Sequence, residues 1–196
     1  EVERWCAAAL AQQPLALCVP GCRVELVVET VGESGVKVSA LVGFPFGATD
    51  TDVKRFEIET ALEAGAGELD CVMNLGWIRE ANSRAVLREL RDLREAAEER
   101  PVKAILEVSL LTPEQVIWAA HCVREAEVQF LVTATGCAGR PTTVDEVRAI
   151  REAVGPELGI KAVGGLGDPT VATALLAAGA NRLGAFETDV WTREKS

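Results

Sequence analysis

Short apolar runs alternate with longer amphipathic stretches along almost the whole chain. The apolar runs, which we expect to be strands, cover residues 15–19, 36–44, 68–74, 102–109, 128–135, 159–165 and 182–186. The stretches that we expect to be helices cover roughly residues 50–64, 83–99, 113–125, 144–153 and 169–178. Strict alternation of nearly continuous apolar strands with helices indicates a parallel sheet whose faces are covered by helices.

Local signals agree with the helix assignments and narrow the fold. Thr112 precedes Pro113 and Asp168 precedes Pro169, so each of these helices begins with a capping side chain before a first-turn proline. No Gly-x-Gly-x-x-Gly motif follows the first strand, which disfavours an open dinucleotide-binding sheet. We therefore predict an α/β fold, a TIM (β/α)8 barrel, formed as a single domain by residues 1–196.

The predicted barrel is one strand short. The chain begins with a helical pattern over residues 2–12, and seven strand candidates follow it. A barrel of this kind closes with eight strands, and an open gap leaves unpaired strand edges. We expect the missing first strand to precede residue 1, or another element to fill the gap.

Charge and composition limit the classes of partner. The chain carries 30 acidic and 20 basic residues, a formal net charge of −10, which disfavours nucleic acid and anionic membranes as partners. No segment reaches the roughly 20 apolar residues that a membrane-spanning helix requires. The six cysteines contain no Cys-x-x-Cys pair and His121 is the only histidine, so we expect no metal site and reduced thiols in a cytoplasmic protein.

Three charged residues lie inside the predicted apolar strands, namely Asp70, Glu107 and Lys161. Because the strands of a barrel converge on its interior and catalytic groups gather near their carboxyl ends, these are the candidate catalytic residues. A structural role stays open for each of them. Lys161 and Asp70 would then form a buried ion pair, and Glu107 would pair with a neighbouring cation or accept backbone hydrogen bonds.

The positions of the lysines favour Lys161 as an amine nucleophile. The chain has five lysines, and only Lys161 lies well inside an apolar strand. Lys37 and Lys103 stand at strand entrances, where a barrel carries residues that serve stability. Lys161 is therefore the one lysine that we expect in the site.

Residues 130–136, Phe-Leu-Val-Thr-Ala-Thr-Gly, resemble the Phe-Ile-Lys-Thr-Ser-Thr-Gly signature of the deoxyribose-phosphate aldolase family. Further resemblances to this family follow its order along the chain, at residues 42–47, 65–70, 102–112, 159–165 and 178–185. The resemblance implies a class I aldolase-like barrel and carbon–carbon lyase chemistry on a small aldehyde or sugar-like substrate. It implies no metal and no organic cofactor.

The resemblance also implies roles for single residues. Asp70 would belong to a proton relay, and Lys161 would be the second lysine, whose positive charge lowers the pKa of a neighbouring Schiff-base lysine. The residues implied to bind the substrate are Cys18 near its aldehyde, Thr133, Thr135 and Gly136 in the signature segment, and Gly164, Gly165 and Gly184, whose backbone N–H groups would face a phosphate.

Two departures from the family pattern change the expected chemistry. Val132 stands where the family has its Schiff-base lysine, and a valine has no amine with which to form an imine. Phe186 and Glu187 stand where the family has phosphate-holding serines, and a carboxylate there would repel a phosphate. We therefore expect an altered site rather than ordinary cleavage of deoxyribose phosphate.

Three hypotheses follow. In the first, an altered aldolase uses Lys161 as its Schiff-base lysine, with Asp70 or Glu107 as the acid and base. In the second, the chain is a catalytically inactive homologue that acts as a binding or assembly partner. In the third, the same charged residues run non-covalent isomerisation or cyclisation. The expected partners are a small-molecule substrate and either a second copy of the chain or another aldolase-like chain.

Overall fold

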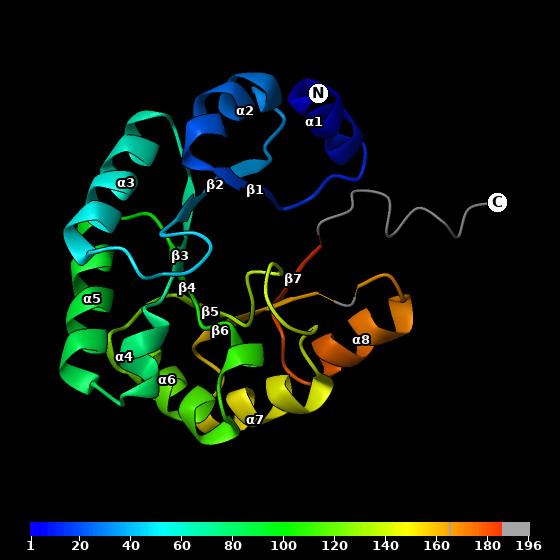
Figure 1. Cartoon of the computed structure of the whole chain (residues 1–196). Coiled ribbons are helices and arrows are strands. Elements are labelled where there is room, and N and C mark those ends of the chain that lie inside the picture. Colours follow the sequence, from blue (N-terminus) through cyan, green and yellow to red (C-terminus); the bar gives the residue numbers. More distant parts are fainter. Residues whose placement is uncertain (165, 186–196) are drawn as a thin grey trace.

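The computed structural model describes residues 1–164 and 166–185. A parallel sheet of seven strands curls around the interior in the order β1 to β7, with its helices outside it (Figure 1). The strands are β1 Ala16–Pro20, β2 Lys37–Val42, β3 Glu68–Val72, β4 Val102–Ile105, β5 Phe130–Val132, β6 Gly159–Val163 and β7 Arg182–Gly184. The predicted TIM-barrel fold is confirmed.

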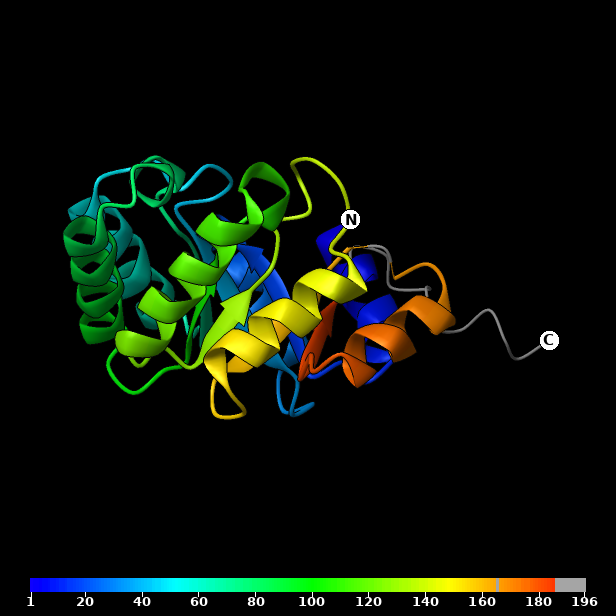
Figure 2. The same ribbon diagram turned by 90° about the horizontal axis from the view of Figure 1, so that it is seen from below.

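The helices form the outer layer. They are α1 Val2–Leu10, α2 Val24–Val31, α3 Thr51–Glu63, α4 Leu75–Arg79, α5 Ser83–Ala96, α6 Pro113–Glu125, α7 Val144–Val154 and α8 Pro169–Ala177. The view turned by 90° shows α6 and α7 lying across the outer face of β5 and β6 (Figure 2). Within the described residues, no helix is long and apolar enough to span a membrane.

Sequence order and spatial order agree around the sheet. Each strand pairs in parallel with the strand that follows it in the chain. β1 and β7 are the edge strands, and no pairing joins them among residues 1–164 and 166–185. That an additional strand fills this position stays a prediction.

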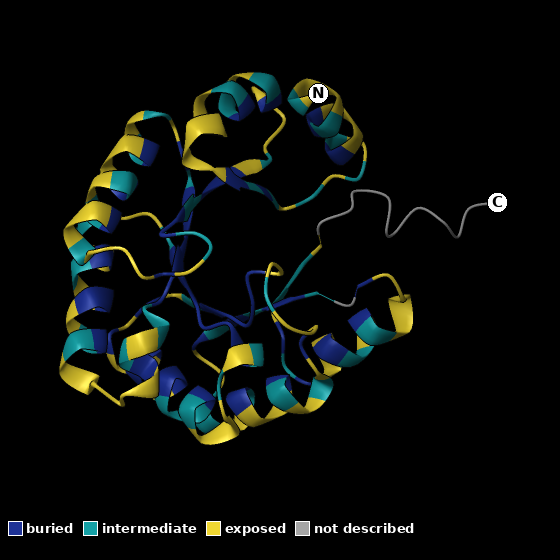
Figure 3. Ribbon diagram, viewed as in Figure 1, coloured by how far each residue is buried: buried dark blue, intermediate teal, exposed yellow. Residues whose placement is uncertain are grey.

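The main core lies between the sheet and the helices, because each helix turns an apolar stripe toward the strands (Figure 3). In α5, for example, Val86, Leu90 and Leu93 are fully buried at helical spacing. The inward faces of the strands make a separate interior. Charged side chains and a smaller apolar cluster share that interior.

Two predicted strands end three or more residues earlier than expected. The run 102–109 was predicted as one strand, but β4 ends at Ile105 and a short 3₁₀ helix covers Val108–Leu110. Glu107 breaks the strand because it adopts a left-handed conformation, with φ of +53°. β5 likewise ends at Val132, although Thr133, Ala134 and Thr135 remain buried. Apolar and β-branched residues continue beyond both strands into buried loops. The sequence pattern therefore predicted strands that are longer than the observed ones.

A buried ion pair lies outside the sheet. Lys54 of α3 and Glu89 of α5 are both fully buried, with Nζ 2.7 Å from Oε1. Lys54 also donates to the carbonyl of Val72 at 2.8 Å, and the backbone N–H of Asn74 donates to Glu89 at 3.2 Å. The pair therefore fastens two helices to the carboxyl end of β3.

Candidate active site

A cavity of about 570 Å³ extends from inside the curled sheet to the helices α1 and α8, where Trp5 and Leu176 line it. Its polar wall is formed by Cys18, Ser39, Asp70, Lys103 and Lys161, which come from β1, β2, β3, β4 and β6. The wall continues to the edge strands, where Leu17 and Arg182 line it. Five different strands thus deliver side chains to one space, as the barrel prediction required.

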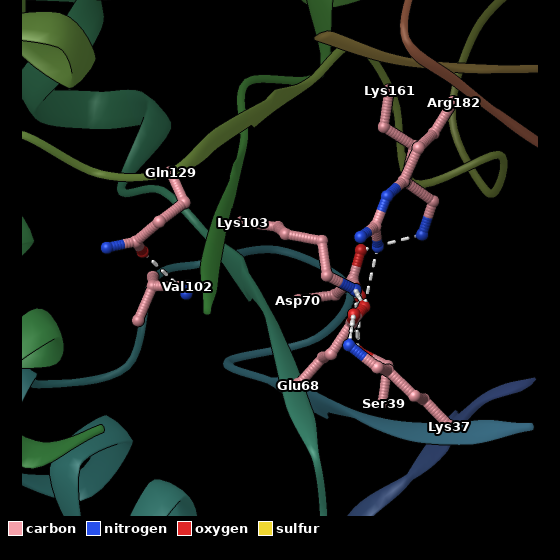
Figure 4. Close-up of polar contacts among 9 residues, drawn as sticks. All are labelled: Lys37, Ser39, Glu68, Asp70, Val102, Lys103, Gln129, Lys161 and Arg182. Carbon is pink, nitrogen blue, oxygen red and sulfur yellow. Dashed lines mark hydrogen bonds and ion pairs between the residues drawn. The ribbon is translucent and has the colours of Figure 1, made fainter. Parts of the chain in front are cut away.

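Asp70 is the centre of the polar wall (Figure 4). Its Oδ1 atom accepts a hydrogen bond from Lys161 Nζ at 2.8 Å. Its Oδ2 atom accepts from Ser39 Oγ at 2.5 Å and from Lys103 Nζ. Asp70 and Lys103 are register partners on adjacent strands, which places both side chains on the inward face.

The two ammonium groups determine the charge state of Asp70. Burial opposes a charge on this carboxyl group, but Lys161 and Lys103 outweigh burial and hold its pKa well below its usual range. Burial alone would lower the pKa of Lys161, and the Asp70 carboxylate more than offsets this, so the pKa of Lys161 is raised. The resting pair is therefore a carboxylate and an ammonium.

Cys18 lies beside this ion pair on the cavity wall. Burial, followed by the negative charge of Asp70, raises the pKa of the Cys18 thiol to about 12. The thiol is therefore neutral near pH 7 and is a poor nucleophile. Its place on the wall agrees with a role in substrate contact.

The prediction that Lys103 stands away from the site is wrong. Its side chain is only 1% exposed, and Nζ lies 3.1 Å from Glu68 Oε2 and 2.8 Å from Ser39 Oγ, besides contacting Asp70. Glu68 in turn binds Arg182 at 2.7 Å. Lys103 is the second residue of β4, and strand alternation turns it inward. Sequence position alone did not reveal this, because it depends on which face of β4 is turned inward.

Glu107 is placed differently from the other two candidate catalytic residues. Its Oε2 atom accepts hydrogen bonds from the backbone N–H of Thr135 at 2.9 Å and from the Thr135 hydroxyl, and Ser109 Oγ donates to Oε1 at 3.0 Å. The described residues that line the cavity include Thr135 but not Glu107. The carboxylate therefore ties the loop after β5 to the loop after β4, as the structural alternative for this residue expected.

Thr133 also connects neighbouring segments of the chain through hydrogen bonds of its hydroxyl group. Its hydroxyl lies 2.6 Å from that of Thr142 and accepts a hydrogen bond from the N–H of Val163 at 3.1 Å. Thr142 donates to the carbonyl of Val163 at 2.9 Å. Gly136 lies in the exposed loop beyond, with φ of +79°. Thr133 and Gly136 are not among the described residues that line the cavity.

Of the glycines expected to bind phosphate, Gly164 and Gly184 are described, and Gly184 lines the cavity. The N–H of Gly164 donates to the carbonyl of Gly184 at 3.3 Å. A Cβ on Gly184 would lie 3.2 Å from Lys161 Cε and 2.9 Å from Val163 Cγ2, so this glycine leaves room for the lysine stem. Gly165, Phe186 and Glu187 lie outside the described residues.

Val132 lies on the cavity wall and is a register partner of Lys161. It belongs to a cluster with Val72, Ile105, Ala134 and Val163. The position of the signature's lysine is thus part of an apolar surface, and the amines on the cavity wall come from the two adjacent strands, Lys103 from β4 and Lys161 from β6.

Relatives of known name match most of the chain, although no family model matches it. Deoxyribose-phosphate aldolase 1 of Bacillus licheniformis is 40% identical over 186 residues, which cover 94% of this chain and 83% of the relative. The solved structure of "QR15, an Aldolase" has a TM-score of 0.91 at 32% identity, over 96% of this chain and 84% of that one. The deoxyribose phosphate aldolase of Aeropyrum pernix, described as a unique tetramer, has a TM-score of 0.86 at 26% identity, over 96% and 80%.

Proposed function

Because this chain belongs to the deoxyribose-phosphate aldolase family, we propose that it is an aldolase-type lyase that acts through an imine on Lys161. The observation that carries the proposal is the position of the Lys161 amine on the cavity wall, 2.8 Å from Asp70, with 14% of its side chain exposed. Lys103 also reaches the wall, but its side chain is almost fully enclosed by Ser39, Glu68 and Asp70. Lys161 is the amine that a substrate can reach.

The chemistry begins with the loss of an ammonium proton from Lys161 to water. The neutral amine then attacks the substrate carbonyl to form a carbinolamine. The carbinolamine releases hydroxide, which takes up the proton held by water, and leaves an iminium ion whose positive charge faces the Asp70 carboxylate. That ion accepts the electron pair of the carbon–carbon bond that breaks while water takes the proton of the substrate hydroxyl, or the reverse reaction uses its enamine to form the bond.

Lys103 and Ser39 serve as positioning residues in this scheme. Both donate to Oδ2 of Asp70, which leaves Oδ1 for the hydrogen bond from Lys161. The positive charge of Lys103 also helps to keep Asp70 a carboxylate. Asp70 therefore remains a negative charge opposite the Lys161 nitrogen, where the iminium charge forms.

The test is carbon–carbon bond formation with small aldehydes, followed by chromatography of the products. We expect turnover by the natural chain and none by Lys161→Met. Lys37→Met is the matched control, because the Lys37 side chain is 52% exposed and contacts Glu68 only at 3.5 Å. Turnover that persists in Lys161→Met, or that survives borohydride treatment, favours non-covalent acid and base chemistry. Absence of turnover and of any imine favours the inactive homologue.

We also propose a small-molecule substrate and a homo-oligomeric, cytoplasmic protein. The cavity has the size of a small-molecule site, and the Aeropyrum pernix relative is described as a tetramer. Light scattering of the purified chain tests the oligomer. A monomer that associates only with a separate aldolase chain would support a hetero-complex instead.

A further inference from the structure

An apolar surface runs along the row of residues that ends at Lys161. Val72, Ile105 and Val132 are successive register partners on β3, β4 and β5, and Val132 is the register partner of Lys161. All three are buried. The cavity wall therefore changes from hydrocarbon to amine within one step between adjacent strands.

Neighbouring residues extend this surface on the cavity wall. Ala134 and Val163 belong to the same cluster, and Leu41 and Phe44 pack against it while remaining partly exposed. Leu41, Phe44, Ile105, Val132, Ala134 and Val163 all line the cavity. A group bound along this surface meets side chains that neither donate nor accept hydrogen bonds.

We infer that the substrate of this site carries a hydrocarbon group on the carbon chain next to the imine, an inference that rests on the proposed function. A hydroxylated or phosphorylated chain would lose its hydrogen bonds to water against this surface without replacement, which is unfavourable. An aliphatic chain gains from the same burial. The preferred class is the simple alkyl aldehyde rather than the sugar-like aldehyde.

The experiment compares borohydride trapping of propanal, butanal, pentanal and hexanal with that of glycolaldehyde and glyceraldehyde. The measured quantity is the concentration that half-saturates labelling of Lys161, read by peptide mass mapping. We expect this concentration to fall about fourfold for each added methylene, and the hydroxylated aldehydes to require the most. Equal half-saturation across both sets would overturn the inference.

One further measurement keeps this outcome separate from a failure of the imine proposal. Binding of alkan-1-ols with the same chain lengths, measured by thermal shift, needs no imine. It should show the same dependence on chain length. If Lys161 is never labelled while the alcohols still show this dependence, the imine fails and the hydrocarbon site stands. If the alcohols show none, the hydrocarbon site is wrong.

A pair of matched variants locates the effect. Val132→Thr keeps the side-chain shape but adds a hydroxyl to the surface, and we expect it to weaken hexanol binding about fivefold or more. Val154→Thr makes the same change on the buried side of α7, away from the cavity, and should leave hexanol binding unchanged. Equal losses in both variants would contradict the assignment of Val132.

Discussion

Lys161 of β6 and Asp70 of β3 form an ion pair across the barrel interior, with Nζ 2.8 Å from Oδ1, although they are 91 residues apart in the chain. The pair raises the pKa of Lys161 and lowers that of Asp70. An amine held in this way is protonated at rest. Its reactivity toward a carbonyl therefore depends on the carboxylate that holds it.

Asp70→Asn should move the pH profile of Lys161 labelling to lower pH. In the natural chain the Asp70 charge outweighs burial, so labelling rises only as the pH approaches the raised pKa of Lys161. Without that charge, burial dominates and the pKa of Lys161 falls. Initial rates of borohydride trapping between pH 6 and about 11 measure the shift. Ser39→Ala, which removes a hydrogen bond but no charge, is the control, and an unchanged Asp70→Asn profile would contradict this explanation.

The same ion pair should make the unfolding free energy of the chain depend on pH in the acid range. Because the folded pKa of Asp70 is lowered, its contribution is fully present above the unfolded value of about 4 and is lost as the pH falls toward the lower folded value. Urea unfolding at a series of pH values below about 5 should show a steeper loss in the natural chain than in Asp70→Asn. Parallel curves would contradict the coupling.

Glu107→Gln separates the two roles considered for this residue. If Glu107 is a loop tie, Gln still accepts a hydrogen bond from the Thr135 N–H, and turnover should fall by less than about tenfold. A catalytic base would lose about a hundredfold or more. Glu107→Ala should cost about 1–3 kcal/mol of unfolding free energy, because it leaves the buried N–H without a partner.

The Lys54–Glu89 pair should matter for stability and not for labelling. Glu89→Gln leaves a buried ammonium without its counter-charge and should cost about 3–5 kcal/mol of unfolding free energy. The double variant Lys54→Met with Glu89→Leu should recover much of this loss, because it buries no charge. Urea unfolding gives both values, and Lys161 labelling should stay within about twofold in each folded variant.

Local signals in the sequence predicted whole elements well. Thr112, Pro113 and Gln115 build the start of α6, where both bonds of a capping box form, and the predicted range 113–125 is the observed helix. The helix α2 was missed because Val24–Val31 is rich in β-branched valines, which are weak helix formers. Tertiary packing stabilises it there.

The candidate site was predicted only in part, because its contacts depend on how neighbouring strands are paired and on which face of each strand is turned inward. Asp70 and Lys161 stood out as charges inside apolar runs, and the structure brings them together. Lys103 did not stand out, since its inward direction follows from the phase of β4 and its contact with Asp70 from the pairing of β3 with β4. The tie between Glu107 and Thr135 joins residues 28 positions apart and left no local pattern.

The most direct test of the imine on Lys161 is site mapping after a single trapping reaction. The natural chain is incubated with butanal, reduced with borohydride, digested and analysed by tandem mass spectrometry. We predict one butyl group on Lys161 at a butanal concentration that leaves Lys37 and Lys54 unmodified. A butyl group on Lys103 in place of Lys161, or no modified lysine at saturating butanal, would contradict the account.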